Sequence, residues 1–132
     1  MKIKSSQDLV QQALSEISTL SPLEVKKLNE EKNCTLIDIR DIRELWSKGT
    51  IENSLHIPRG MIEFWLDPSS NYYKPEKFKE DKKIILFCAA GFRSALATKS
   101  LVDMGYNNVA HVSEGFEGLK NAGAKVIEKD KK

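Results

Sequence analysis

The residues with the clearest chemical potential are a cysteine and an arginine, Cys88 and Arg93, at the two ends of a short loop. The cysteine follows the apolar run 84–87, which is typical of a buried strand, and the helix-forming segment 95–104 comes after the loop. This order places the thiol at the carboxyl end of a strand, facing the N-terminus of a helix. Backbone amides at that position and the arginine both favour a sulfur anion. The pattern therefore predicts a reactive cysteine, although many free cysteines are simply small buried hydrophobes.

The loop between these two residues consists of three small residues and one aromatic residue: Ala89, Ala90, Gly91 and Phe92. Small side chains let successive backbone N–H groups turn inward as an anion-binding nest. The guanidinium of Arg93 offers a fork of donors that suits an oxyanion, but it could also tie the loop down through carboxylates or carbonyls. We therefore expect residues 89–93 to bind the substrate or a sulfur atom carried on the cysteine.

The length of the loop limits what it can hold. Four residues separate Cys88 from Arg93, and the position after five intervening residues is Ser94. A cysteine phosphatase needs five intervening residues to wrap a tetrahedral phosphate. A loop that is one residue shorter makes a smaller pocket, which suits a single sulfur atom held as a cysteine persulfide.

Apolar periodicity predicts that helices and strands alternate through most of the chain. We expect helices that start at residues 21 and 41, and helices over 6–17, 59–65, 95–104 and 116–121. We expect strands over 17–20, 35–39, 54–57, 84–87 and 109–112. Two helix starts, at Ser21 and Asp41, carry an acidic residue three positions later, the pattern of a capping box. This order implies an α/β fold with a mostly parallel sheet, in which sites lie at the carboxyl ends of strands. Asp38 and Cys88 both occupy such positions.

The composition is that of a soluble globular chain of one domain, with 132 residues, 40% apolar and 30% charged. The 21 basic and 19 acidic side chains give a net charge of +2, which argues against a nucleic-acid or membrane-surface binder. No apolar run approaches the ~20 residues that span a bilayer, and the first residues do not resemble a signal peptide. Two distant cysteines, Cys34 and Cys88, suit a reducing compartment, so we expect a cytoplasmic protein with neither a metal nor a cofactor. Cys34 is expected to be inert.

Four segments resemble, in the same order, motifs of the rhodanese-type sulfurtransferases. Cys88-Ala-Ala-Gly-Phe-Arg93-Ser94 resembles the active-site loop of that family, and Leu36-Ile-Asp-Ile-Arg40 with Asp41 resembles its first signature. Residues 54–64 resemble the stretch after this signature, and residues 108–116 resemble the last strand and turn. The resemblance implies the rhodanese-like three-layer α/β fold, with a mostly parallel five-stranded sheet flanked by helices.

The resemblance also implies a domain layout. We expect a single rhodanese-like domain over residues 21–127. An N-terminal helical extension, residues 1–20, is expected to precede it, and a disordered basic tail, residues 128–132, to follow it.

The chemistry that the resemblance implies is sulfur transfer. The Cys88 thiolate attacks the outer sulfur of thiosulfate or a similar donor, sulfite leaves, and the cysteine carries the sulfur as a persulfide held by the amides of residues 89–93. A thiol acceptor, such as glutathione or a thioredoxin-like protein, then takes the sulfur. No general base is needed once the thiolate exists, so His56 and His111 are expected to be structural.

Further residues are expected around the loop. Asp38 and Arg40 match the family's Asp-x-Arg motif and should support the site structurally, together with Ser94. Arg59 follows Pro58, where a loop leads into the predicted helix. It could bring positive charge to the mouth of the pocket, or it could be a solvated surface residue.

The chain departs from the family pattern at two positions. Members that prefer thiosulfate often have a basic residue after the cysteine, where this chain has Ala89, and Leu119 stands where many members have a tryptophan. Members that use mercaptopyruvate tend to end the loop in threonine, where this chain has Arg93. The loop therefore favours thiosulfate or a protein persulfide as the donor.

Two other functions compete with sulfur transfer. The first is a non-catalytic rhodanese-like binding or regulatory module, although such members commonly lose the cysteine or degrade the loop, and this chain keeps both. The second is a cysteine phosphatase or arsenate reductase, which the loop length disfavours.

Overall fold

Five parallel strands form the main sheet of the computed structural model, which describes residues 2–78 and 82–131. In chain order they are β1 (Ser18–Leu20), β2 (Cys34–Asp38), β4 (Leu55–His56), β5 (Lys83–Phe87) and β6 (Val109–Val112). Their order across the sheet is β1-β6-β5-β2-β4, and every neighbouring pair runs parallel. The structure therefore confirms the mostly parallel five-stranded sheet.

The central strand of this sheet is β5, which pairs with β2 on one side and with β6 on the other. Residues 84–87 are all buried. A strand that is covered on both faces needs apolar side chains at successive positions, which explains the continuous apolar run. The strand ends at Phe87, so that Cys88 is the first residue beyond its carboxyl end.

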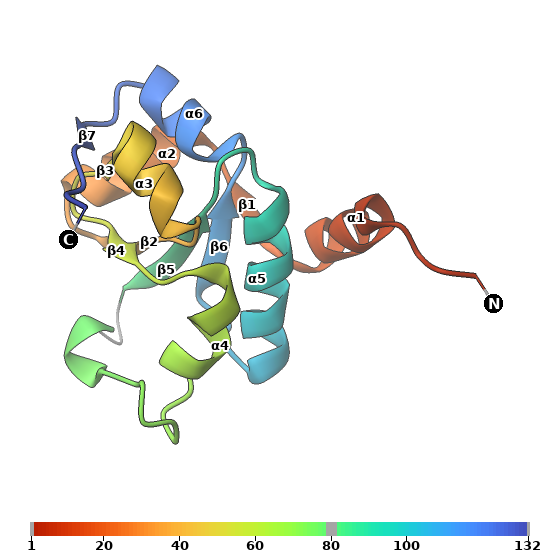
Figure 1. Cartoon of the computed structure of the whole chain (residues 1–132). Helices are drawn as coiled ribbons and strands as arrows, with labels where there is room; N and C mark the ends of the chain where they lie inside the picture. The colour runs from red at the N-terminus through yellow and green to blue at the C-terminus, as the bar shows by residue number, and fades with distance from the viewer. Residues whose placement is uncertain (1, 79–81, 132) are drawn as a thin grey trace.

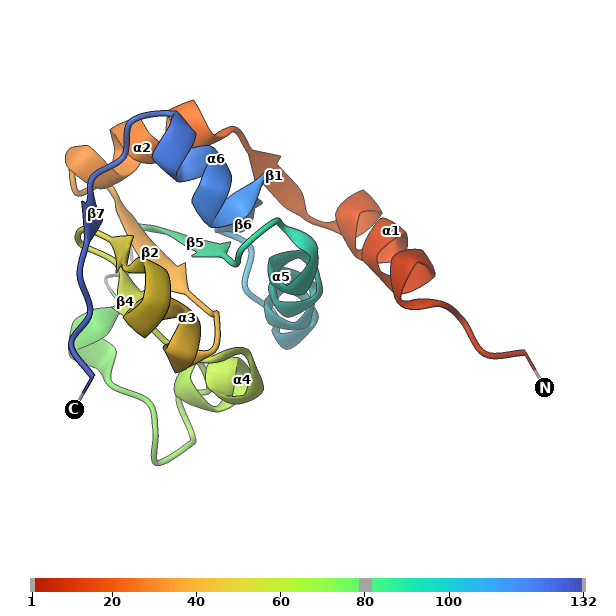
Figure 2. The same ribbon diagram turned by 45° about the horizontal axis from the view of Figure 1, so that its top comes forward.

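Helices cover both faces of the sheet and make a three-layer arrangement (Figures 1 and 2). They are α1 (Ser6–Glu16), α2 (Pro22–Glu30), α3 (Ile42–Lys48), α4 (Ile62–Trp65), α5 (Phe92–Met104) and α6 (Gly115–Asn121), with 3-10 turns at Arg59–Met61 and Pro75–Lys77. Val25 of α2 and Leu119 of α6 pack in the core on one face. Ile62 of α4 and Leu101 of α5 pack in the core on the other.

Three helices begin with a capping box, at Ser5, Ser21 and Asp41. In each, the side chain of the cap accepts a backbone N–H of the first turn, and an acidic side chain three positions later accepts the N–H of the cap. The boxes predicted at Ser21 and Asp41 are therefore confirmed. The box at Asp41 starts α3, which contributes a wall of the site described below.

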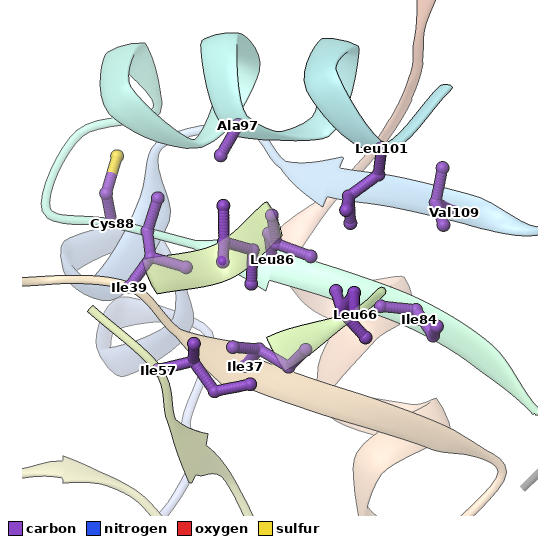
Figure 3. Packing of buried hydrophobic residues seen from close by; sticks show 11 residues of the cluster. Ile37, Ile39, Ile57, Leu66, Ile84, Leu86, Cys88, Ala97, Leu101 and Val109 are labelled. Atoms are coloured by element: carbon purple, nitrogen blue, oxygen red, sulfur yellow. The ribbon is translucent and has the colours of Figure 1, made fainter. Parts of the chain in front are cut away.

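The thiol of Cys88 belongs to the core layer beneath α5 (Figure 3). It packs in the same cluster as Ile39, Leu86 and Ala97. Figure 3 shows its sulfur pointing toward the first turn of α5. The fold thus holds the cysteine between the end of the central strand and the start of a helix, as predicted.

A second, two-stranded sheet was not predicted. It consists of β3 (Thr50–Ile51) and β7 (Val126–Ile127), which pair antiparallel. Strands of two residues are too short to show a periodic pattern in the sequence. This pairing joins residues 126–127, near the end of the domain, to residues 50–51, which follow α3.

Residues 2–20 contact the rest of the domain through two elements, α1 and β1. Residues Val10 and Ala13 of α1 pack against Ala95 of α5, and β1 pairs with β6 at the edge of the main sheet. Residues 18–20, assigned to the extension from the sequence, are thus a strand of the sheet.

At the other end of the chain, residues 128–131 form neither helix nor strand, and the Lys131 ammonium lies 5.4 Å from the centre of the Trp46 ring. Lys132, the last residue of the predicted tail, lies outside the described residues. None of the helices in the described part of the chain is both long and apolar enough to cross a membrane.

Candidate active site

The sulfur of Cys88 lies in a pocket of hydrogen-bond donors. The backbone N–H of Gly91 donates to Sγ at 3.1 Å, and that of Ser94 donates at 3.3 Å. The Ser94 hydroxyl oxygen lies 3.5 Å from the same sulfur. The side chain is only 1% exposed, so these groups replace the water that would otherwise solvate the sulfur. Such donors stabilise a thiolate more than a thiol.

The loop achieves this geometry because Gly91 adopts a left-handed conformation, with φ of 101°. Gly91 is the N-cap of α5, so the helix begins at Phe92 rather than at the predicted residue 95. Arg93 and Ser94 therefore lie in its first turn, whose free N–H groups and dipole favour an anion.

The amides of residues 89–93 are predicted to hold the sulfur of a Cys88 persulfide, and the structure shows one of them, Gly91, donating to the thiol sulfur itself, together with Ser94 just beyond that range. In the described part of the chain, the hydrogen bonds to Sγ come from Gly91 and Ser94. Ala89 and Ala90 form the turn that leads from Cys88 to the helix, and Ala90 is exposed. Phe92 is 58% exposed and presents an aromatic ring at the surface beside the loop.

A second turn, between β6 and α6, supports the loop from behind. The N–H of Phe116 donates to the carbonyl of Cys88 at 2.7 Å. Glu114 and Gly115 both have positive φ, 62° and 54°. A Cβ atom at Gly115 would overlap the Cys88 carbonyl oxygen and lie 2.7 Å from the carbonyl carbon of Ala89. Only glycine lets the two turns approach this closely.

Arg93 is held by a carboxylate of the neighbouring helix α3. Its Nη1 lies 2.8 Å from Oε2 of Glu44, and its Nη2 donates to Oε1 at 3.1 Å. Hydrogen bonding from Arg93 holds the pKa of Glu44 below its usual range. Of the two roles considered for Arg93, the structure displays the loop anchor, because both ends of its fork contact Glu44.

Asp38 and Arg40 form a buried ion pair beside the site. Arg40 Nη2 lies 2.7 Å from Asp38 Oδ2 and also donates to the carbonyl of Gly49 at 2.8 Å. The Thr50 hydroxyl donates to the same carboxylate at 2.7 Å, and the guanidinium lies 4.1 Å from the centre of the Phe116 ring. The pair therefore links β2 to the start of β3 and to α6, which carries the supporting turn.

The loop borders a cavity of about 520 Å³. The cavity is lined by residues between β2 and α3, of α3, of α6 and of the loop: Arg40, Asp41, Arg43, Glu44, Ser47, Lys48, Ala89, Phe116 and Glu117. Side chains of both charge signs thus surround the cavity beside Ala89. Arg59 is not part of this lining, since its guanidinium pairs with Glu63 at 3.1 Å on α4.

The sequence did not reveal that His111 and Thr19 belong to one group of polar side chains behind the sulfur. His111 of β6 is buried, and its Nδ1 lies 2.9 Å from the Ser94 hydroxyl. Its Nε2 lies 3.0 Å from the hydroxyl of Thr19 on β1. Burial lowers the pKa of His111 to about 4, so the imidazole is neutral near pH 7. The only sequence signal was a polar residue two positions after the buried Val109, on the same face of the strand.

The other histidine and the other cysteine lie apart from this group. His56 Nε2 is 2.8 Å from the carbonyl oxygen of Arg40 and steadies the chain after β2. Cys34 begins β2 in the core cluster of the opposite face, and burial raises the pKa of its thiol to about 11. Such a thiol is almost entirely protonated near pH 7, which agrees with the expected lack of reactivity.

Known proteins resemble this chain in sequence and in fold. The family model of the rhodanese-like domain matches residues 21–122. A tRNA uridine(34) hydroxylase of Prochlorococcus marinus is 30% identical over 126 residues, which are 88% of this chain and 40% of that protein. The chain thus spans well under half the length of this curated relative.

Two solved structures resemble the chain over most of its length. A Rhodopseudomonas palustris protein of unknown function, described as a possible tyrosine phosphatase, is 40% identical with a TM-score of 0.88, covering 96% of this chain and 97% of that one. The polysulfide-sulfur transferase homodimer of Wolinella succinogenes is 27% identical with a TM-score of 0.72, covering 94% and 88%. The matched domain includes the strand, the loop and the helix that hold Cys88, and the chain belongs to the rhodanese-like domain family.

Proposed function

We propose that this protein is a sulfurtransferase that carries a sulfane sulfur as a persulfide on Cys88. The observation that carries the proposal is the environment of Sγ, which accepts two backbone N–H groups, one from Gly91 in the loop and one from Ser94 just after Arg93. This arrangement stabilises a sulfur anion without a metal or an external base. The similarity to a polysulfide-sulfur transferase supports the same chemistry.

The proposed reaction has two steps. The Cys88 thiolate attacks the outer sulfur of thiosulfate, the S–S bond of the donor breaks, and its electron pair leaves with sulfite. In the second step the thiolate of an acceptor attacks the outer sulfur of the persulfide. The new S–S bond forms on the acceptor, and Cys88 leaves as the original thiolate.

The cavity beside Ala89 is the proposed place for the acceptor. Its volume of about 520 Å³ exceeds what a single small anion needs, and Lys48 and Glu117 bring charges of opposite sign to its walls. A zwitterionic thiol such as glutathione carries charges of both signs, and we propose it, or a thioredoxin-like protein, as the acceptor. Because both cysteines are free thiols, we place this activity in a reducing compartment such as the cytoplasm.

The ion pair between Arg93 and Glu44 affects which sulfur donor the site would prefer. Its donor fork contacts Glu44, and Ala89 contributes no charge. An anionic donor such as thiosulfate must therefore compete with a carboxylate for the guanidinium. A persulfide or a polysulfide has no SO3 group for this guanidinium to bind, and we propose such a donor beside thiosulfate.

Phosphate-ester hydrolysis is the alternative that the Rhodopseudomonas palustris relative raises. The loop holds Sγ between two amides, and its arginine is paired with Glu44. A phosphate would need a wider loop and a free guanidinium. A non-catalytic binding module is the third candidate, and it predicts no turnover of either substrate.

Steady-state kinetics with thiosulfate and cyanide separate the three functions. We expect thiocyanate production with parallel double-reciprocal lines, the pattern of a covalent intermediate. Cys88→Ser should abolish it, whereas the matched control Cys34→Ala should retain it. Hydrolysis of an aryl phosphate without thiocyanate production would favour the phosphatase. The absence of turnover with thiosulfate, polysulfide and aryl phosphate would favour the binding module.

A further inference from the structure

A row of polar groups leads from the buried sulfur of Cys88 to the edge of the main sheet. The Ser94 hydroxyl lies 3.5 Å from Sγ and 2.9 Å from Nδ1 of His111. The Nε2 atom of the same imidazole lies 3.0 Å from the hydroxyl of Thr19. Cys88, Ser94 and His111 are buried, whereas Thr19 is exposed to solvent. The row therefore has one end at the reactive sulfur and the other in water.

The geometry of the sheet fixes the outer half of this row. Thr19 and His111 are register partners of the parallel strands β1 and β6, which are neighbours in the main sheet (Figure 1), so by register their side chains stand on the same face. The helix α5 covers that face, and its Ser94 hydroxyl contacts Nδ1 of the imidazole, the nitrogen that does not face Thr19. Thr19 lies before residues 21–122, the range of the family model, so the segment preceding that range supplies the outer end.

We infer that Ser94, His111 and Thr19 conduct the proton of the Cys88 thiol to solvent. His111 is a positioning residue in this scheme, because it acts on the sulfur through the Ser94 hydroxyl. The inference rests on the proposed function only for the use of the thiolate as a nucleophile. The proton path itself requires no sulfur donor.

The proton steps balance, because the relay groups gain and lose equal numbers of protons. The S–H proton passes to Ser94 Oγ, the Ser94 proton to His111 Nδ1, the Nε2 proton to Thr19 Oγ1, and the Thr19 proton to water. Each hydroxyl ends with one proton, and the imidazole changes only its tautomer. Cys88 is left as a thiolate, which now accepts a hydrogen bond from Ser94.

A neutral imidazole is required for this transfer, because it must accept on one nitrogen while it donates on the other. Burial lowers the pKa of His111 to about 4, with no contribution from a charged side chain in the described part of the chain. The polar side chains that face the imidazole are Thr19 from β1 and Ser94 from α5, and Cys88 after β5 follows through Ser94. The relay thus gives the sulfur, which is only 1% exposed, a polar route to solvent.

A stopped-flow pH jump tests the conduit, with the ultraviolet absorbance of the thiolate as the signal. All variants are made in a Cys34→Ala background, and an equilibrium titration first locates the pH range in which the Cys88 thiol ionises. Thr19→Val removes the outer hydroxyl from an exposed position and keeps the β-branched shape. His111→Gln retains hydrogen-bonding groups but has no second tautomer, and Thr19→Ser is the matched control.

We expect the parent protein and Thr19→Ser to form the thiolate within the instrument's mixing time of about a millisecond. Thr19→Val and His111→Gln should each show a resolved phase at least about tenfold slower, at an unchanged melting temperature. A purely structural role of His111 would alter stability and leave the rate unchanged. If either variant ionises as fast as the parent, or if the parent is as slow as the variants, the conduit is wrong.

The outcome is independent of the proposed function. If these transients behave as expected but no donor places sulfur on Cys88, the sulfurtransferase proposal fails and the conduit stands. If sulfur is transferred but the transients do not change in the variants, the conduit fails and the proposal stands.

Discussion

At the scale of single residues, the chemistry of the site depends on the hydrogen-bond and ion-pair partners of Cys88 and Arg93. The sulfur of Cys88 is satisfied by amides of Gly91 and Ser94, so its anionic form does not require a nearby cation. Arg93, the cation that the loop does carry, is bound by Glu44. Glu44 therefore both anchors the loop and limits the attraction of the site for anionic donors.

Glu44→Gln tests this dual role through the pH dependence of stability. Because Arg93 lowers the pKa of Glu44, the ion pair stabilises the fold above the usual carboxyl value of about 4.5, and this stability is lost as pH falls through the lower folded value. In urea titrations we expect the wild type to be more stable than the variant near neutral pH, and the difference to disappear in acid.

The matched control is Glu117→Gln, on another wall of the same cavity. It should leave the Glu44–Arg93 pair and its pH dependence unchanged. The KM for thiosulfate should also fall in Glu44→Gln, because the guanidinium of Arg93 is freed. An equal or higher KM would show that Arg93 serves only as an anchor.

At the scale of elements, two turns and one helix start define the loop. The left-handed Gly91 starts α5, and the turn at Gly115 presses against Cys88 and Ala89 from the other side. The edge strand β1 then adds Thr19 to the group behind the sulfur. Each element contributes backbone groups or one side chain, and none forms the site alone.

Gly115→Ala should damage this packing. The new Cβ would overlap the Cys88 carbonyl oxygen at a position with φ of 54°, so we expect a loss of at least about 2 kcal/mol in unfolding free energy and a strong loss of sulfur transfer. Chemical denaturation and thiocyanate assays measure both. Gly60→Ala is the matched control, because nothing lies within 4 Å of its Cβ position. A Gly115→Ala protein as stable and active as this control would show that the close approach is unimportant.

At the scale of the whole molecule, the parallel sheet collects these groups at one edge. The carboxyl ends of β2 and β5 lie next to each other, since these strands pair in register up to Asp38 and Phe87, so Asp38 and Cys88 both lie at this end of the sheet. The buried Asp38–Arg40 pair then ties this edge to the second sheet and to α6. The ion pair is therefore expected to stabilise the entire domain.

Arg40→Ala tests whether the buried Asp38–Arg40 pair stabilises the domain. Removing one partner leaves the Asp38 carboxylate buried without its cation, which costs about 3–5 kcal/mol. Arg43→Ala is the matched control, because Arg43 also pairs with an aspartate two positions earlier but is exposed. Urea unfolding of the two variants should show a large loss for Arg40→Ala and little change for Arg43→Ala. Similar losses in both would contradict the supporting role of the buried pair.

The parts of the fold that local sequence determines were predictable. The apolar run of β5, the cap at Asp41 and the loop after Cys88 each depend on residues close together in the chain. The partners of the site were not predictable in this way, since Glu44 and Arg93 are 49 positions apart and Thr19 and His111 are 92 apart. Such pairs become visible only when the strand order and register are known.

The most direct test of the persulfide is the intact mass of the protein after incubation with thiosulfate or polysulfide and removal of the donor. We expect the wild type and Cys34→Ala to gain one sulfur atom, which cyanide then removes, and Cys88→Ser to gain none. A wild type that stays unmodified by both donors, or a gain that persists in Cys88→Ser, would contradict sulfur transfer through Cys88.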